Sequence, residues 1–258
     1  MILYFLIAIG ATTLGAITGM GGGVFMKPIL DILGDFPVST ISILSAITVF
    51  SMALVSVYRQ RKNEEKPETA VAVPLAIGAV VGGNVGSLLL GRLVAGMSGA
   101  RMTLVQNAIL AALVVFVVIY MRNKSRIPSP KLGGTVPSAL VGLALGVFAS
   151  FLGIGGGPIN VALIVLLFDY PTKKAAACSL ITILFSQAAK LVQTALTVGF
   201  AGFDLQMAPV MVVGAILGGT LGAAIAKGID EDKTDKLFQA AQVLILIICA
   251  VNIVRNSG

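Results

Sequence analysis

The sequence predicts an all-α polytopic membrane protein built from two homologous inverted repeats. Three observations lead to this prediction. The chain of 258 residues is 57% hydrophobic and only 11% charged, long apolar segments recur along it, and one glycine-rich motif occurs twice. A soluble domain carries about 25% charged residues, whereas residues 1–26 and 132–168 contain no charged side chain at all. Several segments supply the roughly 20 apolar residues that a membrane span requires.

The apolar segments follow the same order in both halves of the chain. In the first half, two segments flank the first glycine cluster and three helices follow, at 2–18, 24–34, 38–58, 70–92 and 102–121. In the second half, the corresponding segments are 136–152, 157–168, 174–198, 206–227 and 235–254. We therefore divide the chain into a first repeat (1–122), a cytoplasmic linker (123–134) and a second repeat (135–258).

Three sequence blocks align between the halves. Gly19–Gly23 (GMGGG) align with Gly153–Gly157 (GIGGG) at an offset of 134, and Ser45–Thr48 align with Ser179–Thr182 at the same offset. GAVVGGNVG at 78–86 aligns with GAILGGTLG at 214–222 at an offset of 136. Three blocks in the same order indicate an internal repeat.

The distribution of Lys and Arg favours an inverted arrangement of the halves. If each glycine cluster is the tip of a re-entrant hairpin, each half crosses the membrane three times, and four loops share one face: 59–68, 122–131, 169–174 and 227–236. That face then carries 13 Lys and Arg, against four on the other, which are Lys27, Arg92, Arg101 and Arg255. Four crossings per half would make the halves parallel and split these residues nine to eight, excluding Lys190. The positive-inside rule favours the first arrangement. It places the four loops in the cytoplasm and both termini on the external side of the inner (plasma) membrane.

The duplicated glycine cluster predicts an anion site. A helix break is tolerated at membrane depth only against protein or a water-filled cavity, and the short helix after each break presents free N–H groups and a positive dipole end. Glycine lets an anion approach this backbone closely, and proline suits the first helical turn. The alternative is that the glycines only allow close helix packing. The candidate residues are Gly21, Gly22, Gly23, Gly155, Gly156, Gly157 and Pro158.

A polar stripe on the helices at 38–58 and 174–198 adds further candidates. In the second half, the polar residues follow one another at steps of three or four, as on one face of a helix: Ser179, Thr182, Ser186, Lys190 and Gln193. From the two stripes, the predicted site includes Ser45, Thr48, Ser179, Thr182 and Lys190. Lys190 is the only charge that the sequence places well inside a span, which makes it a functional candidate; the alternative is snorkelling to the interface. Asn160 and Gln187 are additional polar candidates. No carboxylate is expected deep in a span, because Asp31, like the other acids, falls near a segment end.

Other features exclude several classes of function. The third helices carry glycines at four-residue spacing, which indicates close packing, with Asn84 as a polar exception. The chain has no His, and Cys178 and Cys249 have no metal-ligand spacing, so neither a metal nor a cofactor is expected. No nucleophile lies beside a base, which argues against an enzyme. The net charge of +7 arises largely in short loops, where it sets orientation rather than binding nucleic acid.

The duplicated motif resembles the TauE/SafE family of sulfite and sulfonate exporters. The resemblance rests on G-x-G-G-G followed by an apolar run and Pro28, on the second cluster, and on the glycine-rich third helices that begin near Pro74 and Pro209. It covers nearly the whole chain. One departure is Ala162, which stands where the first block has Pro28. The resemblance implies transport of small sulfur-containing or organic anions across a bacterial inner membrane.

These observations together predict a secondary carrier for a small anion. Sulfite, a sulfonate or another organic acid anion is the expected substrate, bound between the glycine tips near the midplane, and the lipid bilayer is the other partner. A channel or facilitator and a non-transporting subunit of a larger complex are the alternatives. A coupling ion, H⁺ or Na⁺, and a homo-oligomeric state are left open by the sequence.

Overall fold

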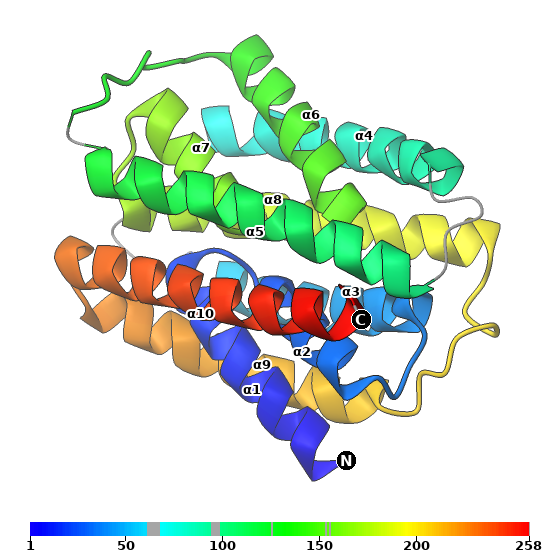
Figure 1. Cartoon of the computed structure of the whole chain (residues 1–258). Coiled ribbons are helices and arrows are strands. Elements are labelled where there is room, and N and C mark those ends of the chain that lie inside the picture. Colours follow the sequence, from blue (N-terminus) through cyan, green and yellow to red (C-terminus); the bar gives the residue numbers. More distant parts are fainter. Residues whose placement is uncertain (61–67, 94–98, 125, 153, 155, 258) are drawn as a thin grey trace.

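A computed structural model describes residues 1–60, 68–93, 99–124, 126–152, 154 and 156–257 (Figure 1). These residues form helices without any strand, and each predicted helix is present with bounds within four residues of the expectation. The helices are α1 (Ile2–Thr18), α2 (Gly23–Leu33), α3 (Val38–Gln60), α4 (Thr69–Leu93), α5 (Gly99–Asn123), α6 (Thr135–Leu152), α7 (Pro158–Phe168), α8 (Thr172–Thr197), α9 (Ala208–Gly228) and α10 (Glu231–Ser257).

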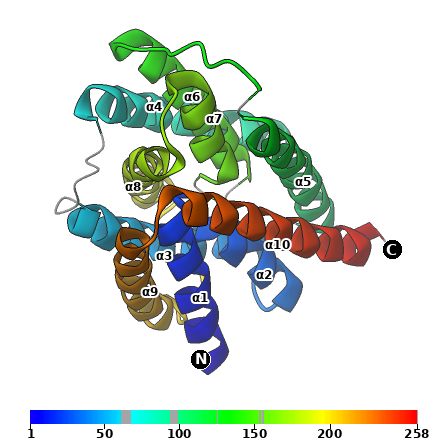
Figure 2. The same cartoon turned by 90° about the vertical axis from the view of Figure 1, so that its left-hand side faces the viewer.

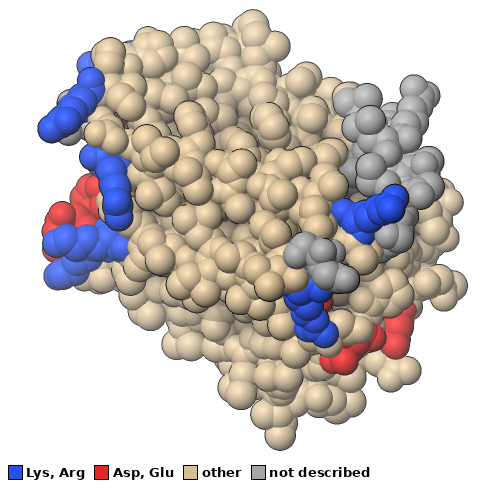
Figure 3. All heavy atoms as spheres, in the orientation of Figure 1, with Lys and Arg blue, Asp and Glu red and all other residues tan. Residues whose placement is uncertain are grey.

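Seven helices of the described chain are long and apolar enough to cross a membrane: α3, α4, α5, α6, α8, α9 and α10. Large apolar side chains such as Phe116, Leu140 and Leu221 lie exposed on their outer faces. On the face seen in Figure 3, Lys and Arg gather toward the two ends of the molecule, and a broad uncharged surface lies between them. An exposed apolar surface of this kind is stable in lipid.

Gly19–Gly22 lie between α1 and α2, and Ile154, Gly156 and Gly157 lie between α6 and α7. The Tyr4 hydroxyl, near the start of α1, donates a hydrogen bond to the carboxylate of Asp35, just after α2, and the Tyr4 ring contacts Phe36 with centroids 5.8 Å apart. In the second half, the Leu132 N–H, just before α6, donates to the Leu167 carbonyl in α7 at 2.7 Å. In each pair, residues at the start of the first helix therefore contact residues near the end of the second.

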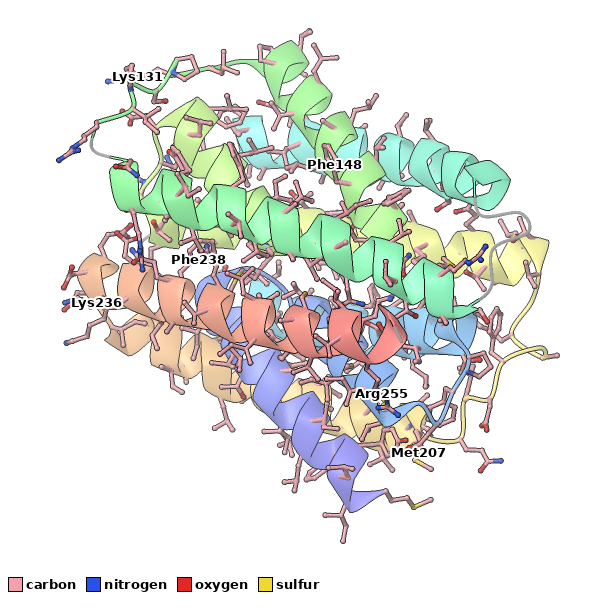
Figure 4. All side chains as sticks on the ribbon, in the orientation of Figure 1. Lys131, Phe148, Met207, Lys236, Phe238 and Arg255 are labelled. Carbon is pink, nitrogen blue, oxygen red and sulfur yellow. The ribbon has the colours of Figure 1, made fainter. Side chains whose placement is uncertain are left out.

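The two hairpins open at opposite ends of the molecule. Glu231, at the start of α10, accepts a hydrogen bond from the backbone N–H of Thr172, which follows α7. Arg255, near the end of α10, donates to the Ile32 carbonyl in α2. These two residues of α10 are 24 positions apart, or about 36 Å along a helix. Figure 4 shows Lys236 and Arg255 toward opposite ends of α10.

The halves exchange α4 and α9, so each of these helices packs against the opposite half. Figure 2 shows α9 beside α1 and α3, and α4 beside α6 and α8, and these are direct packing contacts. The helices α3 and α8 pack on each other, as do α5 and α10. The helix α10 runs from Lys236 toward Arg255, whereas α5 ends on the side of Lys131 (Figure 4), so these two counterparts run in opposite directions.

The glycines of α4 and α9 allow this exchange. A Cβ atom added at Gly82 of α4 would overlap the Leu143 carbonyl of α6, and one added at Gly218 of α9 would overlap the Thr12 hydroxyl of α1. Backbones can approach this closely only where the side chain is absent. The packing interpretation of these glycines is therefore confirmed.

We expect Gly82→Ala to destabilise the protein by about 1–3 kcal/mol, because the added methyl meets rigid backbone and must push α4 and α6 apart. The thermal unfolding midpoint in detergent measures this effect. Gly10→Ala is the matched control, since nothing lies within 4 Å of a Cβ added there. Equal midpoints for the two variants would contradict the packing role.

Candidate functional site

The two glycine tips touch each other inside the bundle. A Cβ atom added at Gly23 would overlap the carbonyl oxygen of Ile154, which belongs to the second tip. One added at Gly157 would lie 3.8 Å from Val24 in the first tip. Ile183 of α8 contacts both tips, at 3.0 Å from such an atom at Gly21 and 2.7 Å from one at Gly156. The starts of α2 and α7 therefore lie close together.

Glycine is required by the backbone at both turns. Gly19 ends α1 with φ 72°, and Gly156 has φ 140°, both in the region that L-residues with a side chain avoid. The helix α2 begins after Gly22 and α7 begins after Gly157, and no side chain caps either N-terminus. The orphan N–H groups of these first turns are thus not satisfied by side chains, which is the feature that lets a helix N-terminus bind an anion.

Three polar residues surround the tips. Ser45 of α3 lies beside Gly23, with its Oγ 3.1 Å from the position of an added Cβ. The Ser179 hydroxyl of α8 donates to the Gly19 carbonyl at 2.6 Å. Asn160, in the first turn of α7, is 2% exposed, and its Oδ1 has no hydrogen-bond partner among the described residues. A buried amide oxygen without a donor is unusual and leaves Asn160 free to bind a ligand donor.

The remaining predicted residues are less closely tied to the tips. The hydroxyls of Thr48 and Thr182 donate to carbonyls of their own helices, at 2.7 and 3.0 Å. Gln187 is buried on α8, and Pro158 occupies the first turn of α7 as expected. Gly155 lies outside the described residues.

Lys190 lines a separate polar pocket. It is seven residues beyond Ile183 on α8, or about 10 Å along the helix axis. Its Nζ donates to the Oγ and the carbonyl oxygen of Ser42 in α3, at 2.8 and 3.1 Å, and no carboxylate of the described residues pairs with it. The other polar pocket residues come from α4, α6 and α8: Asn84, Ser87, Ser150, Ser186 and Gln193. A cation surrounded by neutral hydroxyl and amide groups favours a small anion.

Comparison with known proteins places this architecture in a family. The family model described as sulfite exporter TauE/SafE matches residues 4–253. The chain belongs to the TauE/SafE family. This match confirms the resemblance seen in the sequence. Neither the curated proteins nor the solved structures include a match to the chain.

TauE/SafE proteins are membrane transporters for sulfur-containing anions rather than enzymes. Together with the seven apolar helices, membership makes this chain a multi-pass membrane protein of a transporter family. Among the described residues, no group of three or more His, Cys, Asp or Glu side chains could hold a metal ion. The polar side chains described at the tips and in the Lys190 pocket carry hydroxyls, amides and the Lys190 ammonium group.

The structure corrects one expectation about buried charge. Lys27 and Asp31 of α2 form an ion pair of 3.1 Å whose side chains are only 2% and 1% exposed. Lys190 is therefore not the only charged side chain inside the protein, and the Asp31 side chain is also buried, although Asp31 lies near the end of α2 as expected. The reason is that α2 is surrounded by α1, α3 and α10. The spacing of four residues between Lys27 and Asp31 is a sequence signal for a helical ion pair.

Charged loops gather at one end of the TauE/SafE bundle. Lys124 of the linker region pairs with Asp235 of α10, and Lys174 of α8 pairs with Glu68 at 3.0 Å. Hydrogen bonds from Tyr170 and Lys174 hold the pKa of Glu68 below its ordinary value. Together with the hydrogen bond from Lys124 to Thr172, these contacts join Glu68 and the segments around 124, 174 and 235 at one end of the bundle.

Proposed function

We propose that this protein is a secondary carrier for a small anion, with sulfite, a sulfonate or another organic acid anion as the substrate. The anion binds where the uncapped N-termini of α2 and α7 converge, and it reaches them from the pocket around Lys190. The observation that supports this proposal is the contact between the two glycine tips, from which α2 and α7 begin without side-chain caps. Such paired broken helices bind anions at the centre of transporters.

The packing between the tips favours a carrier over an open channel. Ile183 contacts both tips, and Ile154 and Val24 lie where the tips meet, so apolar side chains pack directly against this contact. A carrier requires such a closed centre, because its site must face one side of the membrane at a time. Opening would separate the tips from α8 and expose the site to one face.

Inverted repeats explain how one site could face both sides in turn. The two hairpins open at ends about 36 Å apart, and the counterpart helices α5 and α10 run in opposite directions. We propose that each hairpin is re-entrant, that the halves are inverted, and that movement of either hairpin opens the site toward its own face of the membrane. The loops at 59–68 and 122–131 are assigned to the cytoplasm, and both termini to the outside.

Topology reporters test this orientation. We expect a reporter inserted after residue 128 to be cytoplasmic and one fused at the C-terminus to be external, because α10 carries the chain from the Lys-rich face to the opposite one. Paired reporters that function on opposite sides of the membrane, such as a fluorescent protein and a periplasmic enzyme, measure this. Both positions on one side would restore parallel halves.

Transport by the purified protein in liposomes tests the function itself. We expect saturable uptake of labelled sulfite that is accelerated by unlabelled sulfite on the other side, and inhibited by simple sulfonates. Counterflow of this kind requires a site that alternates between faces, which a channel does not have. Flux that neither saturates nor responds to the opposite side would indicate a channel. Absence of flux for sulfite, sulfonates and organic acids from folded protein would contradict transport and favour a subunit of a larger complex.

A further inference from the structure

A buried polar cluster lies beneath the first glycine tip. Lys27 Nζ donates to Asp31 Oδ2 at 3.1 Å and to Gln106 Oε1 of α5 at 2.9 Å. The Asn252 amide of α10 donates to the Asn107 Oδ1 at 3.3 Å and to the carbonyl oxygen of residue 28 at 2.9 Å. The cluster thus joins α2, α5 and α10 and includes one acid and one base.

One oxygen of the buried carboxylate is left open. Asp31 Oδ2 accepts from Lys27, whereas Oδ1 is buried and no donor among the described residues meets it with full hydrogen-bond geometry, the Asn107 amide being near enough only for a weak interaction with the carboxylate. Burial of a carboxylate is costly unless both oxygens are satisfied. A proton on Oδ1 would relieve that cost, so this atom is suited to exchange one.

The second hairpin shows that the fold does not need charges at these positions. At the offset of 134, Lys27 and Asp31 correspond to Val161 and Val165 of α7, which are 0% and 7% exposed. Apolar residues therefore fill the equivalent space in the same architecture. Replacing a buried ion pair with apolar side chains is often neutral or stabilising, which argues that stability alone does not explain the pair in α2.

The pair is close enough to act on the anion site. Lys27 lies four residues after Gly23, on the short helix whose N-terminus forms the first tip. It also lies within electrostatic range of Lys190. A change in the charge of the pair would therefore alter the potential at both parts of the proposed site.

We propose that Asp31 is the proton-coupling residue of the carrier, an inference that rests on the proposed function. With Asp31 ionised, its negative charge cancels that of the Lys27 ammonium. When the carboxylate takes up one proton, the pair gains a net charge of +1 and favours anion binding. One proton and one monovalent anion then cross together, and the pair with its cargo stays neutral in both the loaded and the empty state.

Other charged and titratable groups stand around this pair. The helix α3 has its ionisable side chains only in its last turn. The ionisable side chains that interact with the pair are Lys190 of α8 and Cys249 of α10. Tyr4 is the ionisable side chain of α1, and Arg255 of α10 donates to the neighbouring Ile32 carbonyl. Within this set of neighbours, the Asp31 carboxylate is the acidic group in direct contact with the buried Lys27 ammonium group.

Asp31→Asn tests the proposal, because asparagine resembles the protonated acid and cannot release a proton. Liposomes with wild-type protein are expected to accumulate labelled sulfite under an imposed pH gradient and to exchange it in counterflow. The variant is expected to keep counterflow exchange, whereas its gradient-driven accumulation falls to the level of protein-free vesicles. Accumulation that persists in the variant overturns the proposal and assigns the proton to bisulfite. Loss of exchange and accumulation together overturns it as well, since a coupling residue is not needed for exchange.

Two further variants guard against loss of folding. The double variant Lys27→Val and Asp31→Val copies the second hairpin, so we expect it to fold even if Asp31→Asn does not. It should then show the same loss of gradient-driven accumulation. Asp235→Asn removes the partly exposed partner of Lys124 at the loop face and should leave the coupling intact. If wild-type protein exchanges sulfite without any response to the gradient, this proposal fails while the proposed function stands. If it does not exchange at all, the proposed function fails first.

Discussion

Lys190→Met is expected to raise the half-saturation concentration for sulfite by about 10- to 100-fold, because a charge-assisted hydrogen bond contributes about 1.5–3 kcal/mol and each 1.4 kcal/mol is tenfold. Methionine keeps an unbranched, apolar stem of similar length and removes the ammonium group. The pocket around it keeps its hydroxyl and amide groups, so residual binding should remain. Concentration-dependent counterflow in liposomes measures this constant. An unchanged value would return Lys190 to a structural role.

Matched variants separate the charge from the contact it makes. Ser42→Ala removes the hydroxyl that accepts from Lys190 at 2.8 Å but keeps the ammonium, so it should change the half-saturation concentration far less than Lys190→Met. Lys227→Met removes an exposed lysine at the end of α9 and should have no effect. If Ser42→Ala matched Lys190→Met, the link between α3 and α8 would be the main role of this lysine.

The helices were predictable from the sequence because the signals that delimit them are local. Glycine clusters interrupt apolar runs at 19–23 and 153–157, and loops with Lys and Arg end the longer runs. The close packing of the third helices was also predictable, since glycines at four-residue spacing leave one helix face without side chains. The helices against which α4 and α9 pack were not predictable, because the exchange between the halves depends on contacts between residues far apart in the chain.

The buried ion pair illustrates what local signals leave out. An 11-residue helix that follows a turn has the same sequence pattern whether it lies at the membrane surface or inside a bundle. Lys27 is buried only because α5 brings Gln106 against it and α10 covers the same helix. The prediction from the sequence assigned this lysine to the outer face. Similarly, the contact of Lys190 with Ser42 requires α3 and α8 to pack together, which the repeat alone does not specify.

Gly23→Ala is expected to abolish transport, with a loss of at least about 100-fold, the effect that a displacement of about 1 Å produces in a preorganised site. The added methyl would overlap the Ile154 carbonyl of the second tip. That atom is backbone, so it cannot move aside as a side chain would. The two tips must separate, and the N-terminus of α2 turns away from that of α7. Sulfite counterflow in liposomes measures the loss.

The outcome must be separated from a general failure to fold. Gly23 has ordinary helical geometry rather than a positive φ, so alanine there favours the helix itself by about 0.5–1 kcal/mol. We therefore expect the variant to insert into the membrane and to elute from a sizing column as the wild type does. Gly10→Ala, in α1, adds the same methyl where nothing lies within 4 Å and should transport normally. Full activity of Gly23→Ala would show that contact between the tips is not required, and the anion would then bind in the Lys190 pocket alone.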